Sequence, residues 1–125
     1  MVREFHRAAG AYTSEEPTLD VPSEVRELRV RLISEELDEL RAALAVDDLV
    51  AVADAIADLL YVVYGAAVAF GIPIEEVFAE VHRANLAKLD SGAGPLERSD
   101  GKLLKPHGWK APDVGGVLRV HAKKQ

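Results

Sequence analysis

The chain contains no cysteine among its 125 residues. A disulfide framework and a thiolate metal site are therefore excluded, and a reducing cytoplasmic compartment is the natural expectation. Residues 1–10 are interrupted by Arg3, Glu4, His6 and Arg7. They offer no apolar core of the kind found in a secretory signal, so we expect no export.

The chain also has fewer basic than acidic side chains, and its net charge is −6. Nonspecific nucleic-acid binding depends on Lys and Arg side chains that neutralise backbone phosphates, so we expect no nucleic-acid partner. The charge is uneven, because residues 102–125 hold six Lys and Arg side chains against Asp113 alone, which leaves −11 on residues 1–101. An acidic body with a basic tail suits a site that holds both metal ions and anionic phosphates.

Apolar spacing and turn residues predict an all-α fold. A short helix over residues 2–9 is followed by a loop to Pro22, and Ser23 is the expected N-cap of a long amphipathic helix that reaches about Ala45. A third helix should begin at Asp47 or Asp48 and run to Phe70, and a fourth should run from Pro73 to about Leu89. The Gly- and Pro-rich residues 90–125 read as an irregular tail. We therefore expect one domain over 1–125, with a helical core at about 23–89.

The third helix lacks charge almost entirely, since Asp54 and Asp58 are its only charged residues between Leu49 and Phe70. A membrane span is disfavoured because two carboxylates in lipid are costly and because the uninterrupted apolar part is short. A helix that is apolar on nearly all sides must instead be surrounded by protein. A chain of this size offers too little cover, so we expect a homodimer or a dimer of dimers.

Acidic side chains gather on two of these helices. At about 100° per residue, Glu35, Glu36 and Glu39 share one arc of the second helix, away from the solvated face that carries Glu27 and Asp38. Asp54 and Asp58 lie one turn apart on the third helix. Two helices joined by a short loop pack antiparallel, so the two acidic groups should meet and should be buried.

Each of these features has a plainer interpretation. An EExxE sequence alone is more often a charged helix face paired with arginines. The aspartates shift the balance, because buried unpaired carboxylates must be protonated, paired with a cation or bound to metal. Oxygen donors in this number suit Mg²⁺, with Mn²⁺ as the alternative.

Four segments together resemble the MazG-like all-α nucleoside triphosphate pyrophosphohydrolases. They are EELDE at 35–39, ADLLYVVYG at 57–65, EVHRANLAK at 80–88 and DGKLLKPHGW at 100–109. The family pattern is ExxE on one helix and ExxD on the next. Glu36 and Glu39 match the first half and Asp58 ends the second, but Ala55 stands where a glutamate is expected, with Asp54 one residue earlier. The resemblance implies a four-helix MazG-like bundle and leaves the number of metals open.

The resemblance also implies Mg²⁺-dependent hydrolysis between the α and β phosphates of a nucleotide, giving a nucleoside monophosphate and pyrophosphate. Glu36 is our candidate for the general base, with Glu35 as the alternative base. The expected metal ligands are Glu35, Glu36, Glu39, Asp54 and Asp58. The expected substrate contacts are Asn85, Lys88, Lys102, Lys105, Trp109 and Tyr61, although Trp109 would serve equally well as an anchor of the tail and Tyr61 as a core or interface residue.

A house-cleaning enzyme that acts on a dNTP, with dUTP as the first choice, is the leading interpretation, because the tail at 100–109 resembles the dUTPase-like branch. Phosphoribosyl-ATP hydrolysis ranks second. A non-catalytic helical dimer that binds a nucleotide or a partner protein is the third possibility, and Ala55 supports it.

Overall fold

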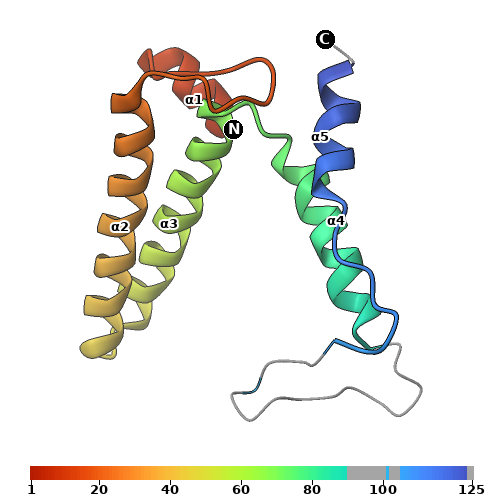
Figure 1. The fold of residues 1–125 in the computed structure, drawn as a ribbon. Helices are drawn as coiled ribbons and strands as arrows, with labels where there is room; N and C mark the ends of the chain where they lie inside the picture. Colours follow the sequence, from red (N-terminus) through yellow and green to blue (C-terminus); the bar gives the residue numbers. More distant parts are fainter. Residues whose placement is uncertain (90–100, 102–104, 124–125) are drawn as a thin grey trace. The chain divides into compact units, whose positions relative to one another are not determined.

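A computed structural model describes residues 1–89, 101 and 105–123, and every regular element among them is an α-helix (Figure 1). The all-α prediction is therefore confirmed. These described residues fall into two compact units, the first over residues 1–72 and the second within residues 73–123. The first holds α1 (Val2–Ala9), α2 (Ser23–Ala45) and α3 (Leu49–Ala69), and the second holds α4 (Ile74–Ala87) and α5 (Val114–Lys123).

The predicted boundaries hold for the first four helices, with one correction at α2. Asp48 caps α3, because its carboxylate accepts a hydrogen bond from the Ala51 backbone N–H at 3.1 Å. Gly71 ends the same helix in the left-handed conformation, with a φ of 65°. Ser23, however, is the first residue of the helix, and Pro22 takes the N-cap position without a side-chain capping bond.

The tail prediction was wrong for residues 114–123, which form α5. Asp113 starts this helix, since its side chain accepts a hydrogen bond from the Gly116 N–H at 3.0 Å. Gly115 and Gly116 lower the helix propensity of the segment. Packing against α4 outweighs that local preference.

In the first unit, α2 and α3 form a helical hairpin and α1 packs on α3 (Figure 1). The loop after α1 closes over the end of α3. Ser14 donates from its backbone N–H to Val68 O at 3.1 Å and from its hydroxyl to Ala69 O at 2.6 Å, while Thr18 N–H donates to Phe70 O at 2.9 Å. Three carbonyls at the end of α3 are thereby satisfied.

Small residues dominate the core of this unit. The buried apolar residues are alanines, such as Ala43 on α2 and Ala55, Ala67 and Ala69 on α3. Larger apolar side chains on α3 remain exposed, and Leu49, Ile56, Leu60 and Val63 follow one stripe of the helix. By length and composition α3 is apolar enough to cross a membrane, a test that core helices of soluble proteins also pass.

Candidate active site

The antiparallel α2–α3 hairpin brings the predicted acidic groups toward each other. The pKa of Glu36 is raised, first by the loss of water around its carboxylate and then by negative charges on both helices. In decreasing order of effect, these charges belong to Asp58, Glu39, Glu35 and Asp54. Four neighbouring negative charges disfavour the charged form of Glu36, so a cation beside it would be favourable. The raised pKa also moves Glu36 toward the range of a useful general base.

The predicted burial of the cluster was wrong for the single chain. Glu36 is half-buried, whereas Glu35, Glu39, Asp54 and Asp58 are exposed. The hairpin buries little of α2, where Arg29 and Ala43 are the buried residues, so the acidic side chains keep contact with water. Within the part of the chain that the structure describes, no three His, Asp or Glu side chains stand close enough to hold a metal ion as they are arranged.

Ala55, at the position where the MazG-like pattern has glutamate, is only 5% exposed. The methyl group is thus covered by protein, and it supplies no oxygen donor to the acidic group. Asp54, one residue earlier, is exposed.

Sequence reasoning missed a buried contact between an arginine of this hairpin and a histidine of α1. Arg29 on α2 is 8% exposed and His6 on α1 is 5% exposed. Arg29 Nη1 lies 3.5 Å from His6 Nε2, and His6 Nδ1 lies 3.3 Å from the Tyr12 carbonyl oxygen. That carbonyl requires a proton on Nδ1, which leaves Nε2 to accept from the guanidinium.

A protonated His6 would place a second positive charge beside the buried Arg29 guanidinium, so this contact is sensitive to the protonation of His6. Burial lowers the pKa of His6 below its ordinary value, the bond to the Tyr12 carbonyl opposes that effect, and the charge of Arg29 lowers the pKa further. Arg29 Nε has no hydrogen-bond partner among the described residues. His6 therefore belongs to the fold as a neutral acceptor.

A repeat of seven residues links this group to the acidic cluster. Glu36 follows Arg29 by seven residues on α2, and Gly65 follows Asp58 by seven on α3. Two turns of helix return nearly to the same face. Because the helices run antiparallel, Arg29 meets Gly65 while Glu36 faces Asp58. The seven-residue spacing can be found in the sequence, but the burial of Arg29 cannot.

The predicted substrate contacts are divided between the two units. Tyr61, on α3, is 42% exposed and makes an edge-to-face contact with Phe5 at 5.6 Å between ring centroids. In the second unit, Lys88 Nζ lies 5.4 Å and Lys105 Nζ 5.2 Å from the centroid of the Trp109 ring. Asn85 is exposed on α4, and Lys102 lies outside the described residues.

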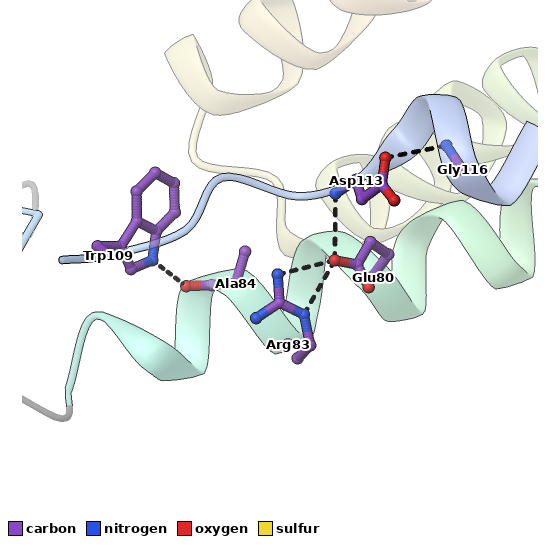
Figure 2. A network of polar contacts seen from close by, with 6 residues as sticks. All are labelled: Glu80, Arg83, Ala84, Trp109, Asp113 and Gly116. Atoms are coloured by element: carbon purple, nitrogen blue, oxygen red, sulfur yellow. Dashed lines mark hydrogen bonds and ion pairs between the residues drawn. The ribbon is translucent and has the colours of Figure 1, made fainter.

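Trp109 anchors its segment, as one of the two expected roles requires. Its indole N–H donates to the Ala84 carbonyl of α4 at 2.6 Å (Figure 2). A second tie holds the same segment at Glu80, whose Oε1 accepts from the Asp113 N–H at 3.2 Å and from Arg83 Nη2 at 2.7 Å (Figure 2). These bonds lower the pKa of Glu80 and raise that of Arg83.

Comparison with known proteins gives one family. Residues 2–85 match the family described as phosphoribosyl-ATP pyrophosphohydrolase, which lies within the MazG-like all-α superfamily. The matched segment includes all five candidate metal ligands and ends at Asn85. No match was found among curated proteins.

Proposed function

The chain belongs to the phosphoribosyl-ATP pyrophosphohydrolase family, and we propose that it hydrolyses the α–β phosphoric anhydride of a nucleotide. Water attacks at phosphorus, the anhydride bond breaks, and pyrophosphate leaves while the other product keeps a monophosphate. The water proton passes to Glu36. The observation that carries this assignment is the raised pKa of Glu36, which results first from the loss of water around its carboxylate and then from the negative charges of four neighbouring carboxylates.

Phosphoribosyl-ATP is the substrate that the family match supports best, ahead of dUTP. The preference for dUTP rested on the sequence of residues 100–109, and the matched segment does not reach them. Both substrates present the same triphosphate to the acidic cluster, so discrimination must lie in contacts to the base and sugar.

The acidic cluster suits Mg²⁺, because its donors are all carboxylate oxygens and because their mutual repulsion favours a hard cation. Glu35, Glu39, Asp54 and Asp58 would hold the ion, which when bound neutralises phosphate oxygens and acidifies water. Glu36 would share in holding it or act as the base. The raised pKa of Glu36 supports the second role.

We also propose that the protein works in the cytoplasm as a homodimer. Leu49, Ile56, Leu60 and Val63 expose a continuous apolar stripe on α3, and each side chain is at least 39% exposed. A second copy placing the same stripe against it would bury both. Analytical ultracentrifugation should give twice the chain mass, and Leu60→Asp should give monomers. A monomeric parent protein would contradict this part of the proposal.

Product analysis tests the activity directly. The full chain is incubated with Mg²⁺ and either phosphoribosyl-ATP or a panel of canonical and modified dNTPs, and pyrophosphate is measured. Loss of a general base costs about 10²- to 10⁴-fold in rate, so Glu36→Gln should fall in that range. Glu27→Gln removes the same charge from an exposed position of α2 and should retain full activity. Absence of pyrophosphate from every substrate would contradict the proposal.

Ala55 favours a second candidate, a protein that binds the nucleotide without hydrolysing it. Its buried methyl group removes one carboxylate from the family set, and the described acids do not form a closed three-ligand site. Calorimetry that detects nucleotide binding without pyrophosphate release would favour this alternative. Gain of turnover in Ala55→Glu would then identify the missing ligand as the cause.

A further inference from the structure

Helix α1 is attached to the rest of its unit through one buried side chain. It lies at the end of the hairpin where α2 begins and α3 ends (Figure 1), and His6 is its one buried residue. Phe5 is 56% exposed and adds an edge-to-face contact with Tyr61 on α3. The exposed ion pair of Arg7 with Glu15, at 3.5 Å, contributes little. The attachment of α1 therefore depends on the surroundings of His6.

Three elements meet around the His6 ring. The loop after α1 supplies the Tyr12 carbonyl oxygen, 3.3 Å from Nδ1, and α2 supplies Arg29 Nη1, 3.5 Å from Nε2. On α3, a methyl group at Gly65 would lie 3.0 Å from Nε2, so the backbone of this helix closes a third side. Arg29 is the charged side chain whose field acts on the ring.

A neutral ring satisfies these neighbours, and a protonated ring does not. With its proton on Nδ1, His6 donates to the Tyr12 carbonyl and accepts from Arg29 at Nε2. A second proton on Nε2 would replace the acceptor with a donor and set an imidazolium beside a guanidinium. Both side chains are buried, and Arg29 Nε already lacks a partner among the described residues. Release of α1 would return both groups to water, which favours their charged forms.

The chain after α1 supplies a pivot and a fixed point. Gly10 ends the helix in the left-handed conformation with a φ of 73°, and a Cβ there would meet nothing within 4 Å. The Ala11 N–H donates to the His6 carbonyl at 2.8 Å, so this residue stays with α1. Ser14, in contrast, is tied to the last turn of α3 by two hydrogen bonds. Residues 2–11 can therefore move as one piece while Ser14 holds the loop in place.

We propose that α1 is an acid-released latch, held closed by the contact between His6 and Arg29. At neutral pH the helix covers α3 around Gly65. When His6 is protonated, residues 2–11 detach while the α2–α3 hairpin stays folded, and Phe5 leaves Tyr61 at the same time. The latch does not depend on hydrolysis of any substrate, so it goes beyond the proposed function.

Hydrogen exchange of the full chain, read by mass spectrometry, tests this release helix by helix. Protection factors for α1 and α3 are measured from about pH 7.5 to about pH 5, after correction for the intrinsic exchange rate at each pH. Below pH 6.5 the opening constant of α1 should rise by up to about tenfold per pH unit, which is at most about 30-fold at pH 5. The protection of α3 should persist over the same range.

Three variants separate His6 from other sources of pH dependence. His6→Gln keeps a donor and an acceptor but has no charge to gain, so α1 should open equally at all these pH values, whatever its absolute protection. Arg29→Gln offers a protonated Nε2 an oxygen, so the rise should be smaller than in the parent protein. His82→Gln removes an exposed histidine from the second unit and should respond like the parent protein. Any effect of the raised pKa of Glu36 persists in His6→Gln and is thereby distinguished.

Four outcomes would overturn the latch. Loss of protection in α1 and α3 together would mean that the whole unit unfolds. An α1 opening constant that does not change with pH in the parent protein would remove the acid response. An undiminished rise in His6→Gln would assign the response to another group, and an undiminished rise in Arg29→Gln would show that the guanidinium does not hold α1 closed.

Discussion

Gly65 lies where α3 approaches Arg29 and His6, and Gly65→Ala tests how tightly that contact is packed. A methyl group at this position would lie 2.7 Å from Arg29 Nη1 and 3.0 Å from His6 Nε2. An arginine tip usually moves aside at little cost. Here it is buried and in contact with His6, so moving it would separate the two side chains.

Two opposing effects set the magnitude. Alanine is better than glycine in a helix interior by about 1 kcal/mol. Overpacking a filled site costs about 1–3 kcal/mol. The balance predicts that Gly65→Ala lowers the free energy of unfolding by about 1 kcal/mol, which corresponds to a fall in Tm of about 4–8 °C for a unit of this size.

Thermal unfolding followed by circular dichroism measures the change. Ala53→Gly, at an exposed position of the same helix, calibrates the propensity effect and should cost about 1 kcal/mol. In an Arg29→Ala background the principal clash disappears, so Gly65→Ala should become less destabilising or change sign. If Gly65→Ala stabilises the parent protein as much as Ala53→Gly destabilises it, the packing argument is refuted.

Three further results should follow. Because the folded pKa of His6 lies below 6.5, the unfolded chain binds the proton more tightly than the folded chain does, so the free energy of unfolding should fall as pH drops from about 6.5 through the folded pKa. His6→Gln should remove that part of the pH dependence. An unchanged pH profile in the variant would contradict this explanation. Asp48→Ala should cost about 1 kcal/mol through loss of the cap on Ala51, while Asp48→Asn should cost much less in the same melts. Without metal, Glu36→Gln should raise Tm at neutral pH by relieving repulsion, and a lower Tm would argue against the charge field.

Helix positions were predictable where local signals and tertiary packing agree. Asp48 supplies a cap, Gly71 supplies a left-handed stop, and the apolar run between them leaves no alternative to a helix. Residues 114–123 were missed for the opposite reason. Gly115 and Gly116 argue against a helix locally, and only the cap at Asp113 and the packing on α4 reverse that preference.

For the site, the sequence identified which carboxylates act on one another but not their exposure. Helical spacing places Glu36 opposite Asp58 once the hairpin is assumed, and the electrostatics of Glu36 agree. Burial depends on the width of the seam between α2 and α3, whose buried apolar residues, such as Ala43 and Ala55, are alanines. No periodicity rule reports that width. The pairing of Lys88 with Lys105 at Trp109 was likewise hidden, because it depends on how a loop returns to α4.

The buried guanidinium and the acidic cluster lie at different levels of the α2–α3 hairpin, since Arg29 meets Gly65 and Glu36 faces Asp58. Arg29 is buried beside a neutral histidine, while Glu36 sits among four other acids. Seven residues of helix separate their backbone positions by about 10 Å along the axis, and Arg29 is not among the charges that shift the pKa of Glu36. A direct ion pair would commit the carboxylate to the guanidinium and lower its basicity. Separation leaves Glu36 free for a cation or a proton, which is what hydrolysis at this cluster would require.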